Sequence, residues 1–475
     1  MITNSEEFSY DYLLKVVKIQ FNLVRRRLLA HFRQEWAKKN VICWLVFLVC
    51  YSLFPVWSPS GLFFYFGLVA GIPALIFGPV FSGLLFMRIA IYGFPGDTSV
   101  ALCADVGKLP KLRVRVFTRG LEEGLVSRMM MHNIGVFKDI GFNNYDYIVV
   151  SNVAPVNLPM VPDVSTGNLF VSQSYQTKTN AMYKARSMQF CLDEERDTCP
   201  DSDYMLVLDE DVQLTPSSVR GVLNFMHHGF EIGDGIYSSL GAQQWALQDD
   251  QRLPAIIFET QRCATLLIAE LFKKLGIRQS FAAFGGFLIL KIKTARELGF
   301  DCGETLGIAE DLHLMLRALS AGYTIRHVDG FVKIKSTTNI QGVVDQRRRF
   351  AMGYFLHCFS GNKVSMEFKR FTAIYFWSTW LYPVLFMMNV CAFHDKIWPF
   401  VVTCLISEAL ATFCTLKIAS NAEGLMGKEF LPQLLLSMYA TPMRYWYGMA
   451  LPGLSATKGF LFNNNLAEWK ARPKG

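Results

Sequence analysis

The sequence of 475 residues is 52% hydrophobic and 14% aromatic, and it carries a formal net charge of +8. This composition is too apolar for an ordinary soluble enzyme and too charged for a protein that lies wholly within a membrane. Eleven cysteines are present, but none are spaced as CxxC, so the sequence shows no zinc pattern and no disulfide framework. We expect a catalytic region that faces a reducing compartment.

The chain begins with a basic leader, predicted over 1–40, in which Glu35 is the only acidic residue between Lys15 and Lys39. Such a block can bind nucleic acid. Because an apolar run follows it directly, we interpret it instead as the cytosolic flank of a membrane segment and expect no nucleic-acid binding. The first apolar run starts only at Val41, so no cleavable signal peptide is expected.

Uncharged apolar runs predict membrane segments near both ends of the chain. Within 41–92, the runs 41–57 and 61–87 predict two transmembrane helices. The region 366–475 predicts two to three more, at 371–393, 397–416 and the proline-interrupted 430–452, after an interfacial helix that starts at SMEFKRF. The second of these contains Glu408, which is costly in lipid. The predicted protein is therefore a multi-pass membrane protein.

Between these groups, from 96 to 365, strand and helix patterns alternate. Strands are expected at 111–120, 143–152, 204–212 and 284–292, and helices at 181–194, at 217–229 with a cap at Ser217 or Ser218, and at 309–322. Alternation of this kind predicts an α/β domain with a mostly parallel sheet. Ligands bind beyond the carboxyl ends of the strands in such sheets.

The stretch MLVLDEDVQLTPSSV ends an apolar strand with three carboxylates, Asp209, Glu210 and Asp211. They form either a solvated acidic turn or a site for a cation, and Mg²⁺ or Mn²⁺ would offset their repulsion. Haloacid-dehalogenase-type phosphotransferases also place Asp-x-Asp after a strand. They want Thr or Val four residues after the first Asp, where this chain has Gln213, so we disfavour that interpretation.

Two later stretches add candidate residues. Glu310 and Asp311 begin a predicted helix, where the helix dipole alone would favour acids. In DQRRRF, Gln346, Arg349 and Phe350 form either a basic face near a membrane or a diphosphate site, because the planar fork of arginine suits phosphate oxygens.

In this order, the three stretches resemble the D, DxD, ED, QxxRW signature of membrane-embedded family 2 glycosyltransferases. RVFTRG, YKARSMQFCL, DSDYMLVLDEDVQLTPSSVRGVLNF, AEDLHLMLRALSAGY and QRRRF are similar to the Egghead β-1,4-mannosyltransferase group. The resemblance covers residues 111–360 and implies a GT-A-like catalytic domain, predicted over 96–365.

The resemblance also implies roles. Asp209 and Asp211 would hold Mg²⁺ or Mn²⁺, and Asp311 would be the catalytic base. Thr118, Arg119, Lys184, Gln346 and Arg349 would bind the nucleotide-sugar donor and its diphosphate, and Glu310 and Phe350 would contact the acceptor. Two departures stand out. Phe350 replaces a tryptophan, and no acid follows the second strand, where Ser151 and Asn152 stand after an earlier Asp146.

The implied activity is an inverting transfer of hexose, with mannose from GDP-mannose and glucosylceramide as the favoured pair. The site would face the cytosol at the endoplasmic reticulum or Golgi membrane. A processive β-polysaccharide synthase, whose acceptor is a polymer, and a ceramide glucosyltransferase-like enzyme are the alternatives in the same superfamily. Outside it stands a non-catalytic transporter or scaffold, for which Glu408 could mark an ion path. The oligomeric state is not indicated.

Overall fold

The structure, a computed structural model, describes most of the predicted catalytic region and little of the two ends. The described ranges are 83–93, 100–103, 105–238, 249–277, 284–303, 309–335, 340–359, 364–380, 409–414 and 450–455, with a few single positions. The predicted leader and the first predicted span lie outside them, as do most of the other predicted spans. Among the helices that can be described, none has both the length and the apolar character that a bilayer crossing requires.

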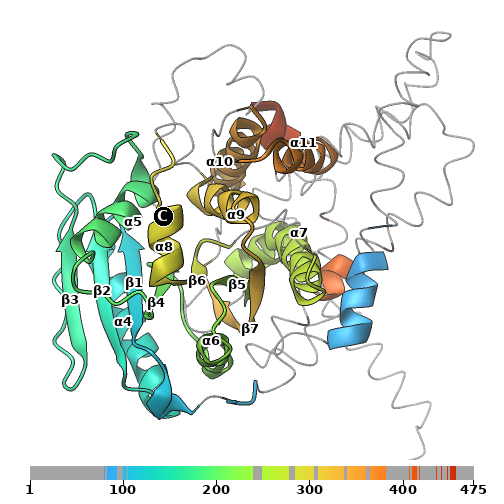
Figure 1. The fold of residues 1–475 in the computed structure, drawn as a ribbon. Coiled ribbons are helices and arrows are strands. Elements are labelled where there is room, and N and C mark those ends of the chain that lie inside the picture. Colours follow the sequence, from blue (N-terminus) through green and yellow to red (C-terminus); the bar gives the residue numbers. More distant parts are fainter. Residues whose placement is uncertain are drawn as a thin grey trace, which may run out of the picture.

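A seven-stranded sheet runs through the centre of the described residues (Figure 1). In spatial order, its strands are β3 (Ser165–Phe170), β2 (Tyr145–Ser151), β1 (Leu112–Thr118), β4 (Tyr204–Asp209), β6 (Phe287–Lys291), β5 (Ile232–Ser238) and β7 (Ile325–Lys333). Every neighbouring pair is parallel except the two pairs that involve β6, which is antiparallel to both β4 and β5. The predicted α/β class and mostly parallel sheet are confirmed.

Helices cover both faces of this sheet. They are η1 (Val106–Lys108), α4 (Glu123–Ile140), α5 (Tyr183–Glu194), α6 (Pro216–His227), α7 (Asp249–Lys274), α8 (Ile292–Leu298), α9 (Glu310–Ser320), α10 (Ile340–Phe359) and α11 (Met366–Trp380), and a further helix spans 83–92. Side chains of α4, α6 and α7 share one hydrophobic cluster with the sheet, and side chains of α5, α8 and α9 share a second. The sheet is thus the middle layer of three.

The side chains of β4 show how the sequence produces these layers. Leu206 and Leu208 belong to the first cluster, whereas Met205 and Val207 belong to the second, and all four are buried. Successive residues of a strand point to opposite faces, so a strand buried on both sides must be a continuous apolar run. The run ends at Asp209, the last residue of the strand. Glu210 and Asp211 therefore follow at the carboxyl end of β4, where Asp211 is still buried.

Helix α6 begins differently from the sequence prediction. Thr215, and neither Ser217 nor Ser218, is the cap: its hydroxyl accepts a hydrogen bond from the Ser218 backbone N–H, 3.2 Å away, and the Ser218 hydroxyl accepts one from the Thr215 N–H. This reciprocal pair is a capping box. Pro216 follows the cap at the first helical position, which suits its fixed φ, so the predicted cap was wrong by two or three residues.

Candidate active site

The carboxyl ends of β1 and β4 lie side by side and carry the first polar groups of the site. Thr118, the last residue of β1, donates a hydrogen bond from its hydroxyl to Glu210. A turn follows β4, in which the Val212 N–H donates to the Asp209 carbonyl oxygen, 3.1 Å away. All three consecutive acids line the cavity, and Glu210 is in addition bound to Thr118.

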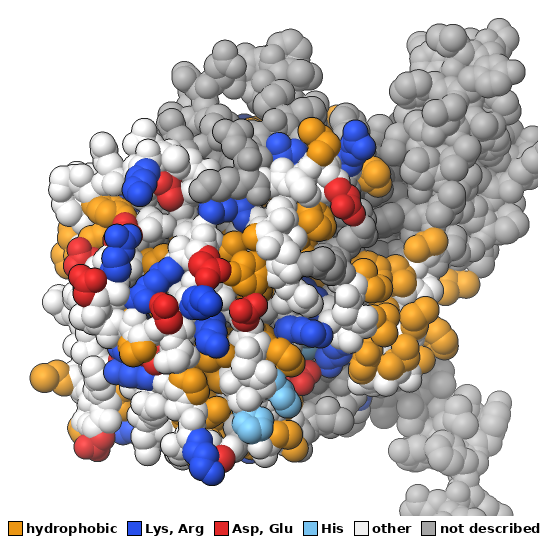
Figure 2. Space-filling view, in the orientation of Figure 1, with side chains coloured by type: hydrophobic (Ala, Val, Ile, Leu, Met, Phe, Trp, Pro, Cys, Tyr) orange, Lys and Arg blue, Asp and Glu red, His pale blue; other side chains and the backbone are white. Residues whose placement is uncertain are grey.

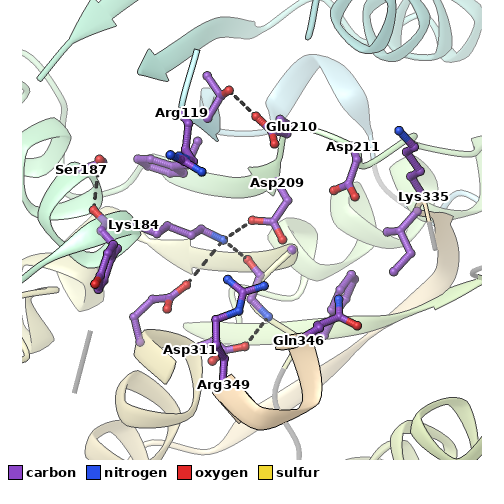
Figure 3. A pocket seen from close by; sticks show the side chains of 18 of the residues that line it. Arg119, Lys184, Ser187, Asp209, Glu210, Asp211, Asp311, Lys335, Gln346 and Arg349 are labelled. Carbon is purple, nitrogen blue, oxygen red and sulfur yellow. Dashed lines mark hydrogen bonds and ion pairs between the residues drawn. The ribbon is translucent and has the colours of Figure 1, made fainter. Parts of the chain in front are cut away.

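Lys184, in the first turn of α5, connects the two groups of acids. Its Nζ lies 2.6 Å from Oδ1 of Asp209, 2.7 Å from the carbonyl oxygen of Gly285 and 4.0 Å from Oε1 of Glu310. Figure 3 shows Lys184 extending between Asp209 and the wall that carries Asp311 and Arg349. Burial opposes the charge of the ammonium group, but the carboxylates, Asp209 foremost, outweigh burial and raise the pKa of Lys184.

A pair of glycines lets the acids approach the sheet. A Cβ on Gly285 would lie 2.6 Å from the Cβ of Asp311, and a Cβ on Gly286 would lie 2.9 Å from Oδ2 of Asp209. Both distances are shorter than real contacts allow. The stretch FGGFLILKI, predicted only as a strand, therefore contributes a second function just before β6: its glycines leave room for both carboxylates.

Glu310 and Asp311 occupy the first turn of α9, as the sequence predicts. Asp311 accepts hydrogen bonds from the backbone N–H of Gly285, at 3.1 Å, and of Leu312, at 2.8 Å. Burial raises the pKa of both carboxyl groups, and their mutual repulsion raises that of Glu310 further. A carboxyl group with a raised pKa, held by backbone donors inside a cavity, is suited to take up a proton.

Helix α10 presents Gln346, Arg349 and Phe350 to the same cavity, and Arg349 lies on the same side of it as Asp311 (Figure 3). Burial lowers the pKa of Arg349, against the opposing effect of Glu310. The side-chain oxygen of Gln346 is buried and, among the described residues, no donor bonds it. Because buried polar atoms are nearly always paired, this oxygen is available to a ligand.

One cavity of about 430 Å³ collects all these residues. The ten residues predicted from sequence all line it, and they are Thr118, Arg119, Lys184, Asp209, Asp211, Glu310, Asp311, Gln346, Arg349 and Phe350. Further lining residues that the sequence did not single out are Phe117, Val153, Tyr183, Ser187, Arg262, Phe284, Ile334 and Lys335. Segments far apart in the sequence thus meet in one place.

The missing acid after the second strand has a structural counterpart. Asn152 directly follows β2 and lines the cavity, and its buried side-chain oxygen has no hydrogen-bond partner among the described residues. Asp146 lies near the other end of β2, where it forms ion pairs with Arg113 and Arg115. Asn152 therefore stands at the cavity where the motif expects an acid, and Asp146 belongs to the buried charges that stabilise the sheet.

The acids also suit a divalent cation. No group of three or more His, Cys, Asp or Glu side chains with metal-binding geometry occurs in the part of the chain that the structure describes. Asp209 and Asp211 nevertheless provide two carboxylates that line one cavity. Mg²⁺ is commonly held by one or two carboxylates together with substrate phosphates, so this pair is a sufficient protein contribution.

Comparison with known proteins shows which family of enzymes this chain is similar to. Residues 204–426 match the family described as glycosyl transferase family group 2. The resemblance predicted from the motifs is confirmed, and the chain is related to the family 2 glycosyltransferases.

Among them, the chain is similar to the β-1,4-mannosyltransferase egh of Drosophila melanogaster, with 30% identity over 290 residues, which are 60% of this chain and 59% of that protein. It is 28% identical over 274 residues to the β-1,4-mannosyltransferase bre-3 of Caenorhabditis elegans, which covers 57% of this chain and 58% of that protein. The matches thus span less than two thirds of these relatives.

Among solved structures, a mannosyltransferase from Pyrobaculum calidifontis in complex with GDP-Man and Mn²⁺ aligns with 85% of this chain and 100% of its own. The TM-score is 0.44 and the sequence identity is 14%.

Proposed function

We propose that this chain is an inverting hexosyltransferase that moves mannose from GDP-mannose to a membrane lipid-linked acceptor such as glucosylceramide. One observation carries the proposal: the residues of the DED, ED and QRRRF stretches line a single cavity. The similarity to β-1,4-mannosyltransferases supports mannose as the sugar. The sheet with helices on both faces supports a GT-A-like catalytic domain.

In this mechanism, Asp209 and Asp211 would hold Mg²⁺ or Mn²⁺, which when bound would neutralise charge on the donor diphosphate. Lys184 and Arg349 lie beside these acids and would stabilise the negative charge that builds on the departing GDP. Asn152 and Arg119, at the ends of β2 and β1, would contact the nucleoside. The side-chain oxygen of Asn152, which no described residue bonds, would accept a hydrogen bond from an N–H group of the base.

Asp311 would act as the general base. Its carboxylate is fixed by two backbone N–H groups, so it would take the proton from the attacking acceptor hydroxyl without a change of position. That hydroxyl oxygen would form a bond to the anomeric carbon while the bond from this carbon to the diphosphate oxygen breaks. A single displacement of this kind inverts the configuration and needs no covalent enzyme intermediate.

A location beside a membrane, at the endoplasmic reticulum or Golgi and with the site in the cytosol, also belongs to this proposal. The helix at 83–92 exposes Phe86, Met87 and Ile91, whose side chains are 65%, 43% and 55% accessible. Figure 2 shows hydrophobic side chains gathered on the side of the molecule where Figure 1 places this helix. Arg88 of the same helix forms a buried ion pair with Glu270 of α7, 2.6 Å apart, which fixes this apolar surface to the catalytic domain.

The proposal is tested by incubating the detergent-solubilised protein with glucosylceramide and a panel of nucleotide sugars, and by measuring released diphosphate and product mass. We expect GDP-mannose to be the preferred donor and the product to gain one hexose. Products that gain many hexoses would favour a processive synthase. If wild-type protein transferred no sugar, and the Asp209→Asn variant gave the same result, the proposed activity would be wrong.

A further inference from the structure

Arg262 lies in the site, although no motif contains it. It projects from the middle of α7, and its guanidinium carbon lies 5.0 Å from the ring centroid of Phe350. The rings of Tyr237 and Phe284 lie 4.7 Å and 5.9 Å from the same carbon. Three aromatic rings thus surround one guanidinium group at the cavity wall.

A buried carboxylate orients this group from behind. Glu259, one helical turn before Arg262, accepts a hydrogen bond from the hydroxyl of Tyr237 at 2.8 Å. Its carboxylate lies 3.8 Å from Arg262 and 3.6 Å from Arg347, which are ion-pair distances beyond the range of good hydrogen bonds. Glu259 therefore balances part of the charge of Arg262 without taking up its N–H donors, which among the described residues are open to a ligand in the cavity.

Arg262 lies next to Phe350, which replaces the tryptophan of the QxxRW motif. A tryptophan at position 350 would offer an indole N–H as well as an aromatic face, and Phe350 offers only the face. Arg262 packs against this ring and brings several N–H donors to the same place. Donors and an aromatic face together suit a neutral sugar, whose hydroxyl groups accept hydrogen bonds and whose C–H face packs on a ring.

A diphosphate is the poorer partner for Arg262. Lys184, at 2.6 Å, and Arg349 are cations beside Asp209, whereas Arg262 interacts with Asp311. The charge of Arg262 is already partly balanced by Glu259 and Asp311, and three aromatic rings lie around it. A neutral, polar ligand fits these surroundings better than a polyanion does.

We propose that Arg262 positions the acceptor sugar, by donating hydrogen bonds to its hydroxyl oxygens while the rings of Phe350, Phe284 and Tyr237 pack around it. This inference rests on the proposed function and names the group that receives the acceptor. Arg262 takes over the donor role that a tryptophan at position 350 would have, and so holds the attacking hydroxyl near Asp311.

The test compares the R262Q and R262K variants with R326Q as the matched control. Arg326 also packs on an aromatic ring, 5.2 Å from the centroid of Phe230, but it lines a separate surface hollow. With glucosylceramide in mixed micelles, we expect R262Q to raise the acceptor KM about tenfold or more, because a hydrogen bond from a charged donor is lost. The KM for GDP-mannose should stay within about twofold. R262K should lie between R262Q and the wild type, and R326Q should match the wild type.

An acceptor KM that stays at the wild-type value in R262Q, or a donor KM that rises in parallel, would overturn the proposal. Binding of hexyl β-glucoside, measured by calorimetry without any donor, gives a readout that does not depend on turnover. R262K keeps the charge and most of the packing, so its melting temperature should not change. It loses the planar fork of N–H donors, so it should bind this glucoside more weakly than the wild type. Equal binding by both proteins would reject the role of Arg262. If the wild type transferred no sugar but R262K still bound the glucoside more weakly, the proposed transfer would be wrong and the sugar subsite would stand.

Discussion

Adjacent residues of the site, Glu310 and Asp311, meet different partners. Asp311 accepts two backbone hydrogen bonds, whereas the carboxylate of Glu310 lies 4.0 Å from the ammonium group of Lys184. Donors from two segments, Gly285 and Leu312, hold Asp311 in one orientation, whereas the backbone hydrogen bond of Glu310 comes from its own N–H. This difference supports Asp311 as the base.

Asp311→Asn should lower kcat by about 10²- to 10⁴-fold, the usual contribution of a general base. The amide oxygen can still accept a backbone hydrogen bond, so we expect the dissociation constant for GDP-mannose and the melting temperature to stay near the wild-type values. Asp329→Asn, at a half-exposed position on β7, is the control. Wild-type turnover in the Asp311 variant would exclude this residue as the base.

Glu310→Gln tests the charge of the pair through pH. Burial and Asp311 raise the pKa of Glu310 to about 8, above its unfolded value. The stability linked to the protonated carboxyl is fully present below the unfolded pKa and is lost as pH rises through the folded pKa. The variant does not titrate, so its melting temperature relative to wild type should be higher at pH 8.5 than at pH 5.5. From pH 5.5 to pH 8.5, the free energy of unfolding of the variant should rise relative to the wild type by about 1 kcal/mol or more, the equivalent of about one pKa unit. A difference independent of pH would contradict the raised pKa.

At the scale of elements, α9 and α10 meet at Ala309, the residue before Glu310. The Cβ of Ala309 leaves no room for a side chain at Gly353 of α10, where a Cβ would lie 2.4 Å away. One turn later, Nε2 of His357 donates to the carbonyl oxygen of Ala309, 3.2 Å away. The helix that carries Arg349 and Phe350 is therefore packed directly against the start of the helix that carries the base.

Gly353→Ala should push these helices apart. Overpacking costs about 1–3 kcal/mol, and we expect a lower melting temperature together with a kcat reduced more than the KM for GDP-mannose is raised. Gly135→Ala in α4 is the matched control, because a Cβ there meets nothing within 4 Å and should be neutral or stabilising. If both substitutions had the same effect on kcat, the contact between α9 and α10 would have no bearing on the site.

The sequence predicted β1, β2, β4 and β6 because each contains a mainly apolar run whose last residue is polar. It did not predict β3, which is an exposed edge strand, or β5, whose IGDGIYS pattern contains two glycines and an aspartate. β7 was missed because charged and polar residues interrupt it, among them His327, which is buried beside Glu270. In these strands, packing against neighbours outweighs local propensity.

The candidate site was predictable to the extent that its residues lie in short motifs next to strand or helix ends. Asp209, Asp311 and Arg349 have this property. Arg262 does not, because it lies in the middle of a helix whose sequence contains no motif, and only the tertiary contacts with Phe350 and Tyr237 bring it to the cavity. Asn152 stood at the right position but lacked the expected charge.

At the scale of the whole molecule, the acids of the cavity lie next to protein cations. Lys184 lies beside Asp209, and neither of the two hydrophobic clusters that pack on the sheet contains an acid of the cavity. We therefore expect removal of the metal to affect sugar transfer but not the stability of the fold.

Thorough chelation should abolish sugar transfer, and added Mn²⁺ or Mg²⁺ should restore it, because Asp209 and Asp211 are proposed to hold the cation. The melting temperature measured in the same chelated sample should not change. Transfer that continued undiminished after chelation would remove the role proposed for these two aspartates.

The ammonium group of Lys184 has one more consequence. In the resting protein it serves as an internal counterion, bonded at once to a carboxylate and to the Gly285 carbonyl. A dication held by Asp209 would replace this lysine there, and the ammonium group would then be able to contact the donor phosphates. Exchange of partners by a single side chain would then couple arrival of the substrate to assembly of the charged centre.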